Sequence, residues 1–197
     1  MSSNSYYVME MNTRLTNKFI YFRNQPEGLN IAAWQTGEKF MTPPSQMTLV
    51  AEDEIPSEMS DMLLARVELH VYSSRLMATL ASAGVTNIEY FPITVVDKKR
   101  NVTRTDYQVA NIIGSVACLD VSNSGVDTFS DGSGYSSVEE FSLLEDRIQA
   151  LPGMKAPPLL FRLAEFKFHV IAHEALKNAF ERDGITGVRF IPTQDYA

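Results

Sequence analysis

Cysteine, long apolar runs and a secretory signal are scarce or missing in this 197-residue sequence. The single cysteine, Cys118, cannot form a disulfide within the chain, and no catalytic signature surrounds it, so we interpret it as a small buried hydrophobe. No apolar stretch approaches the roughly 20 residues that a helix needs to cross a bilayer. The first residues lack the basic region and apolar segment of a secretory signal. These absences predict a soluble protein of the cytoplasm.

Basic residues are missing from two stretches, residues 40–65 and 105–146, and carboxylates gather in both. The net charge of the whole chain is −7. Segregated carboxylates repel nucleic acid and lipid headgroups and attract basic proteins, although acidic loops can also serve solubility alone. As candidate partner-binding residues we single out Glu52, Asp53, Glu54, Asp127, Asp131, Glu139 and Glu140.

The patterns that carry catalysis or metal binding are incomplete. Residues 127–132 begin like a calcium loop, but Phe129 and Val138 stand where the third and twelfth positions need oxygen ligands. His169 and His173 have metal-ligand spacing, yet a third ligand and a positioned base are missing. We therefore expect no catalytic residues, no metal and no cofactor.

An internal repeat dominates what is present. The segment 70–92, HVYSSRLMATLASAGVTNIEYFP, matches the segment 169–192, HVIAHEALKNAFERDGITGVRFIP, with one more residue between the histidine and the glycine in the second copy. The match extends backwards, where LLAR at 63–66 faces LLFR at 159–162, and three extra residues precede His169. Such a repeat indicates that one structural unit occurs twice.

Each copy predicts a strand, a helix and a second strand. Apolar and β-branched residues around each histidine are typical of a strand, and Leu and Ala then recur at helical spacing. Ser73 and Ser74 can cap the first helix, and Gly84 and Gly184 can end the two helices in the left-handed conformation. The proline at 92 or 192 predicts that the second strand is an edge strand or ends there.

The rest of the chain adds shorter predicted elements. Residues 5–11, 16–23, 31–34 and 47–51 predict strands, with the single tryptophan, Trp34, in the core. Residues 90–96 and 102–113 predict a β-hairpin. A capping box at 137–140 favours a helix over residues 141–151, although the same residues also fit a strand.

The predicted fold is α+β: a mixed β-sheet with two repeated strand–helix–strand units at about 63–96 and 159–192, N-terminal strands and a central β-hairpin. Residues 1–197 are expected to form one compact domain, because repeat halves of about 1–113 and 114–197 would each bury little core alone.

Five segments together resemble a known bacterial family. They are LFRL at 160–163, HVIA at 169–172, GITGVRFIP at 184–192, the run at 84–92, and YQVAN at 107–111. They are similar to the closing signature of immunity family eleven of polymorphic toxin systems, which is typified by a myxobacterial immunity protein and was formerly a domain of unknown function. The resemblance extends from about Leu63 to the C-terminus.

The resemblance implies a cytoplasmic inhibitor that binds and neutralises a toxin domain encoded by a neighbouring gene, without catalysis. Its partner would be a toxin domain, which we expect to be basic, with no nucleic acid or membrane partner. A monomer and a homodimer both remain open. Two alternatives stay open as well. One is a small-molecule or nucleotide-metabolising enzyme with a site between the halves, and the other is a structural subunit of a secretion or surface apparatus. The enzyme's candidate site residues are His70, His169, His173, Arg66 and Arg162.

Overall fold

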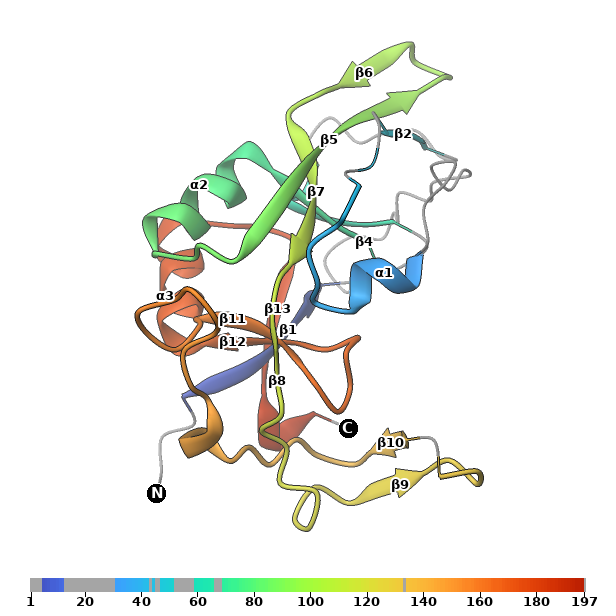
Figure 1. Ribbon diagram of the computed structural model, residues 1–197. Helices are drawn as coiled ribbons and strands as arrows, with labels where there is room; N and C mark the ends of the chain where they lie inside the picture. The colour runs from blue at the N-terminus through green and yellow to red at the C-terminus, as the bar shows by residue number, and fades with distance from the viewer. Residues whose placement is uncertain are drawn as a thin grey trace.

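The computed structural model describes residues 5–12, 31–42, 44, 47–51, 59–65, 69–132 and 134–196, and it shows an α+β fold. Two β-sheets lie one above the other in Figure 1, and helices α2 and α3 lie side by side along them. The prediction of a mixed α+β fold is confirmed.

The first sheet has the strand order β2-β5-β7-β4-β3, with β6 paired to β5. Its antiparallel pairings join β3 to β4, β4 to β7, β7 to β5 and β5 to β6, while β2 runs parallel to β5. The strands of this sheet are β2 (Met47–Val50), β3 (Met62–Ala65), β4 (Leu69–Ser73), β5 (Ile88–Asp97), β6 (Val102–Arg104) and β7 (Tyr107–Ile112).

The second sheet has the order β13-β1-β12-β11-β8. Here β1 pairs antiparallel with both β12 and β13, and β8 runs parallel to β11. Its strands are β1 (Tyr6–Met11), β8 (Ser115–Val116), β11 (Leu160–Leu163), β12 (Val170–His173) and β13 (Val188–Pro192). The N-terminal strand therefore lies between β12 and β13, two strands of the C-terminal repeat.

The two strands of each repeated unit are not neighbours, because another strand lies between them. In the first unit β7 separates β4 from β5, with Gln108 opposite both Tyr72 and Pro92. In the second unit β1 separates β12 from β13, with Tyr7 opposite both Ala172 and Pro192. The two units thus have the same register, although β7 follows its unit directly and β1 comes from the far end of the chain.

The helix caps show that the two copies of the repeat align differently, at the strand histidines, from the alignment that the sequence predicts. Ser73 caps α2 (Ser74–Ser82) through a hydrogen bond of 3.1 Å from the Leu76 N–H, and His173 caps α3 (Glu174–Asp183) through a bond of 3.1 Å from the Ala175 N–H. Ser73 therefore corresponds to His173. The predicted equivalence of the two strand histidines is wrong by one residue.

A similar shift affects the strand before each cap. Leu64 lies opposite His70, and Arg162 lies opposite Val170, so Arg162 corresponds to Leu64 rather than to an arginine. Arg66, which the sequence set against Arg162, lies outside the described residues. The alignment by residue identity is wrong here. The helix caps and the strand pairing set which positions correspond, and they do not require the same residue type in both copies.

The left-handed glycines after the helices are confirmed. Gly184 caps α3 at φ 63°, and Gly84 has φ 89° one residue beyond the cap of α2. Gly187 carries a further constraint, because a Cβ there would lie 2.6 Å from the Ser60 Cβ and 2.7 Å from the Met62 carbonyl oxygen. This close approach brings the start of β13 against the start of β3, and so joins the two halves.

Asp61 is the main polar link between the halves. Its carboxylate, in a residue 6% exposed, accepts hydrogen bonds from Ser73 Oγ and Arg75 in the first half. It also accepts bonds from the backbone N–H (2.8 Å) and hydroxyl (3.0 Å) of Thr186 in the second half. Arg75 in turn donates to the Gly184 carbonyl at 2.9 Å. Burial by itself raises the pKa of the Asp61 carboxyl, but the hydrogen bonds outweigh burial and lower that pKa from 3.8 to about 2.

Three apolar clusters fill the space between these elements. One lies on the first sheet around Trp34, which is 2% exposed and packs edge-on against Phe40 and Phe91 at 4.6 and 5.3 Å between ring centroids. A second joins both sheets to α2 and α3, and a third lies on the second sheet around Phe161. The predicted core position of Trp34 is confirmed.

Two predicted elements are wrong. Residues 31–34 belong to the short helix α1 (Ile31–Gln35), since alanines favour helix and Gly37 ends the turn at φ 75°. Residues 141–151 form no long helix: Leu143 bridges to Leu119 as an extended residue, and a 3₁₀ turn, η1, follows at Glu145–Arg147. The apolar side chains of this segment are buried against the second sheet from an extended backbone, so their spacing imitated a helix.

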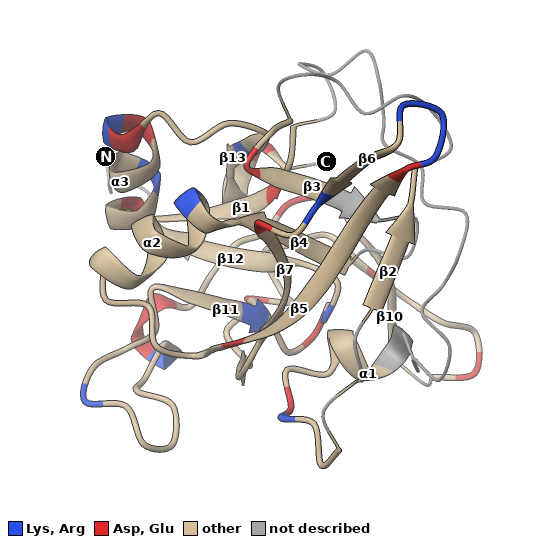
Figure 2. Cartoon of the chain, turned by 90° about the horizontal axis from the view of Figure 1, so that it is seen from above, with Lys and Arg blue, Asp and Glu red and all other residues tan. Residues whose placement is uncertain are grey.

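The other predicted strands are resolved as follows. The strands at 5–11 and 47–51 are confirmed, and that at 16–23 lies outside the described residues. β13 is an edge strand and ends at Pro192 as predicted, whereas β5 continues through Pro92 to Asp97. The central hairpin is confirmed, and β5 pairs with both β6 and β7. The tip of this hairpin carries the basic turn, which is coloured blue beside β6 in Figure 2. In Figure 1 this tip lies at the opposite end of the molecule from β9 (Val126–Thr128) and β10 (Tyr135–Val138).

We propose that both halves fold as one domain, and Val8→Asp tests this. Val8 is 1% exposed in β1, so a charge there should lower the free energy of unfolding by about 3 kcal/mol or more. Trp34, the single tryptophan, reports on the first sheet, which does not contain Val8. In urea unfolding, the midpoint of Trp34 fluorescence should fall together with the midpoint of circular dichroism.

The matched control is Val102→Asp, at a strand position that is 38% exposed, where we expect a change of about 0.5 kcal/mol at most. A Trp34 transition that stays at the wild-type midpoint in the Val8 variant would contradict a single domain.

Asp61→Asn tests the link between the halves. Because the folded-state pKa lies below 3.8, the ionised carboxylate stabilises the fold above that pH, and the stabilisation is lost as pH falls toward about 2. This lowering of the pKa corresponds to roughly 2 kcal/mol in the free energy of unfolding, and the asparagine variant should lose that stabilisation at neutral pH. Asp106→Asn, which breaks an exposed pair with Arg104, should change stability by about 1 kcal/mol at most. Equal losses in both variants at pH 7 would contradict the assigned role.

Candidate partner-binding surface

A two-stranded ribbon made of β9 and β10 projects from the second half. The strands pair antiparallel, with a register shift between Tyr135 and Ser137. Ser137 Oγ donates a hydrogen bond of 2.8 Å to Asp127 Oδ2, which ties the two strands together. The ribbon belongs to neither large sheet.

Buried Ser124 holds the base of this ribbon. Its hydroxyl donates to the Asp120 carbonyl at 2.7 Å and accepts from the Ser142 N–H at 3.1 Å. Its carbonyl accepts from the N–H groups of Glu139 and Glu140, each at 3.3 Å. These bonds fix the backbone on both sides of the ribbon, and so fix where its carboxylates emerge.

The structure brings together four of the seven predicted partner-binding residues. Asp127 lies in β9, Asp131 in the turn that follows, and Glu139 and Glu140 directly after β10, and all four are exposed. The other three, Glu52, Asp53 and Glu54, lie outside the described residues. We define the four residues Asp127, Asp131, Glu139 and Glu140 as the acidic ribbon.

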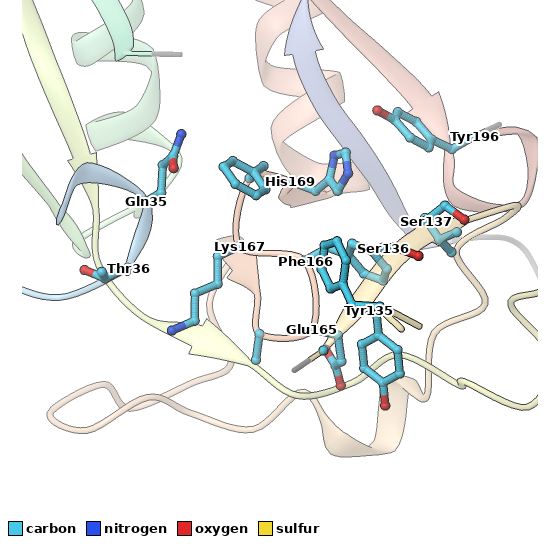
Figure 3. A pocket seen from close by; sticks show the side chains of 15 residues that line it. Gln35, Thr36, Tyr135, Ser136, Ser137, Glu165, Phe166, Lys167, His169 and Tyr196 are labelled. Atoms are coloured by element: carbon cyan, nitrogen blue, oxygen red, sulfur yellow. The ribbon is translucent and has the colours of Figure 1, made fainter. Parts of the chain in front are cut away.

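Beside the acidic ribbon is a pocket with a volume of about 710 Å³. Its walls come from β10, from the loop at residues 164–169 and from the end of α1. Figure 3 shows Gln35 and Thr36 on one side, the side chains of β10 on the other, and Lys167 between them. The aromatic residues that line it are Phe129, Tyr135, Phe166, Phe168, His169 and Tyr196.

Buried Phe141 organises the aromatic wall of this pocket. Its ring lies 4.9 Å from the His169 ring and 5.0 Å from the Tyr196 ring, measured between centroids. Tyr135 stacks on Phe166 at 5.8 Å with an interplanar angle of 27°. Burial lowers the pKa of His169 although the charge of Glu10 opposes the shift, so the imidazole is neutral at neutral pH.

Two of the lining aromatics are exposed, Phe129 by 51% and Phe168 by 60%. Exposed aromatic rings beside a pocket are typical of surfaces that bind another protein, because a partner covers them at the centre of an interface. Sequence reasoning missed both as binding residues. A signal for Phe168 was present, because the sequence shows extra residues before His169. In the register that the structure sets, this loop is two residues longer than its counterpart, since Arg162 and Val170 are eight positions apart while Leu64 and His70 are six apart.

Three described residues of the alternative enzyme site, His70, Arg162 and His173, have structural partners. His70, 8% exposed, hydrogen-bonds Tyr72 at 3.1 Å, and burial together with the charge of Arg162 lowers its pKa to about 3. Arg162, 2% exposed, donates to the Lys167 carbonyl at 2.9 Å, and His173 caps α3. No group of three or more His, Cys, Asp or Glu in the described part of the chain is placed to hold a metal ion.

Cys118 is buried, as predicted, and burial raises the pKa of its thiol to about 12. A thiol with such a pKa stays protonated at neutral pH and reacts slowly. Within the part of the chain that the structure describes, we find no helix that is both long and apolar enough to span a membrane.

The four exposed carboxylates of the acidic ribbon thus lie beside a pocket that exposed aromatic rings line. Residues 5–195 match the model of the immunity protein family Imm11, and the chain belongs to that family. The predicted family is confirmed, and the match also covers residues 5–62, which lie before the part of the chain that carries the predicted resemblance. A search among curated proteins found no significant match.

If the exposed rings serve a partner, removing them should leave the fold intact. We expect Phe129→Ala and Phe168→Ala to change the free energy of unfolding by about 0.5 kcal/mol at most. Phe141→Ala, which empties a fully buried site, should cost about 3–5 kcal/mol. Thermal unfolding of the three variants measures this, and a large loss from either exposed ring would assign that ring to the fold.

Proposed function

We propose that this protein neutralises a toxin domain encoded by a neighbouring gene, by binding it without catalysis, in the cytoplasm. The family match over residues 5–195 carries the proposal, because the family is one of immunity proteins. The described surface supports it, since it combines exposed aromatic rings with gathered carboxylates.

The acidic ribbon belongs to the proposed inhibitory face. Residues 105–146, which contain the ribbon, hold no Lys or Arg, so no basic residue of that stretch offsets its charge. Such a face attracts a basic partner over a distance and speeds their association. The toxin domain is therefore proposed to be basic on the side that docks here. Glu52, Asp53 and Glu54 are proposed as partner-binding residues from the charge pattern of the sequence alone, because they lie outside the described residues.

Co-expression with the neighbouring toxin gene tests the function. Cells should survive the toxin when this protein is present, and the two proteins should co-purify in a one-to-one complex. An unrelated toxin is the control, and it should still kill. Toxicity that persists despite expression of this protein, with no complex formed, would reject the proposal.

Neutralising the ribbon tests its part in the inhibitory face. The triple variant Asp131→Asn, Glu139→Gln, Glu140→Gln should lower the association rate constant by about tenfold at low salt, with a smaller effect at high salt. Asp127 is left unchanged because it accepts the bond from Ser137 within the ribbon. Surface plasmon resonance at several salt concentrations gives the rate constants.

A second triple variant removes the same number of carboxylates elsewhere, at exposed residues of other elements. It consists of Asp106→Asn, Glu174→Gln and Glu181→Gln. This control should associate at nearly the wild-type rate. Equal slowing in both variants would show that the total charge matters and that the ribbon has no special place.

A further inference from the structure

The pocket beside the acidic ribbon has aromatic walls whose faces attract positive charge. Six aromatic side chains line it, and Tyr135 and Phe166 stack within it. The faces of aromatic rings carry partial negative charge, and several rings around one site form the cage that binds ammonium groups. Burial keeps His169 neutral at neutral pH, so this ring adds no positive charge to the wall.

Carboxylates reinforce this preference. Glu165 lines the pocket, and its Oε1 accepts a hydrogen bond of 3.3 Å from the Leu119 N–H. Its Oε2 is buried and has no hydrogen-bond partner among the described residues. A buried carboxylate oxygen without a donor is unfavourable, and a cation from a partner would relieve that cost. Ser137, another lining residue, is bonded to the carboxylate of Asp127.

Among the described lining residues, Lys167 is the one Lys or Arg. It is exposed, and its long side chain can turn toward solvent when a second cation enters. An anionic ligand would need further cations in these walls. An apolar ligand would gain from the rings but nothing from the carboxylates around them.

We propose that this pocket receives a lysine or arginine side chain from the toxin domain, held between the aromatic walls and beside the carboxylates. This inference rests on the proposed function and gives it a location and a chemistry. Ser136, which lies at the register shift of β10, is exposed and lines the pocket, so a change at this residue acts on the pocket directly.

Blocking the pocket tests whether the toxin occupies it. Cys118 is buried and its thiol has a raised pKa, so a new cysteine at Ser136 can be labelled selectively with a bulky maleimide. Labelled Ser136→Cys should bind the toxin at least about tenfold more weakly than the unlabelled variant. Labelled Lys99→Cys, at the exposed tip of the opposite hairpin, should bind as the wild type does. Unchanged affinity after labelling at residue 136 would overturn the proposal.

Charge at Lys167 tests what the pocket holds. Lys167→Glu replaces the pocket's cation with a carboxylate, so a cationic toxin residue should bind about threefold to tenfold more tightly. Lys99→Glu makes the same change in net charge at the opposite end of the molecule, and it should leave affinity nearly unchanged. Affinity that is unaltered or weaker in the Lys167 variant would overturn a cationic occupant.

Measurements on the wild type distinguish a failure of the proposed function from a failure of the pocket assignment alone. If the wild type neither protects cells nor binds the toxin, the proposed function fails and the pocket assignment fails with it. If the wild type protects and binds while both pocket variants match their controls, the function stands and the pocket assignment alone is rejected. Thermal unfolding of each variant should match the wild type, since Ser136, Lys167 and Lys99 are all exposed.

Discussion

The placement of β1 is the constraint on which the whole fold depends. This strand hydrogen-bonds to β12 on one side and β13 on the other, so the second repeated unit is incomplete until the N-terminus docks into it. Its buried residues also join two different cores, because Val8 packs in the cluster of the second sheet and Met9 in the cluster between the helices. In the first unit β7 fills the equivalent place from nearby in sequence. Closing the second sheet therefore requires contacts across nearly the full chain, which is entropically the costlier arrangement.

The halves are also joined by helices and by one buried carboxylate. α2 and α3 bury Leu76, Leu80, Leu176 and Phe180 in a shared cluster, so neither helix has a complete partner within its own unit. Asp61 adds directional hydrogen bonds to this apolar contact, because its carboxylate bonds both to the start of α2 and to the turn before β13. An apolar interface alone would tolerate sliding, whereas a charged group with several fixed donors accepts one alignment.

The proposed binding face combines the segment between the repeated units with a loop of the second unit. The acidic ribbon lies in the long segment between the units, and the loop at 164–169 joins β11 to β12 within the second unit. The strands and helices of the repeated units supply much of the core, and the ribbon and the 164–169 loop line the pocket. A scaffold of this kind can keep its core while its surface segments change.

The sequence by itself determined the local elements. Alternation of apolar residues gave β1 and the strands of both units, and the capping serine and left-handed glycines gave the helix ends, because these signals act within a few residues. Only the tertiary structure decided which strands are neighbours, why Ser73 corresponds to His173, and that the apolar residues around Phe141 are buried from an extended backbone. It also placed four of the predicted carboxylates beside aromatic rings from β10 and from the loop at 164–169. Contacts between distant residues settle such questions, and no local pattern encodes which distant segments will meet.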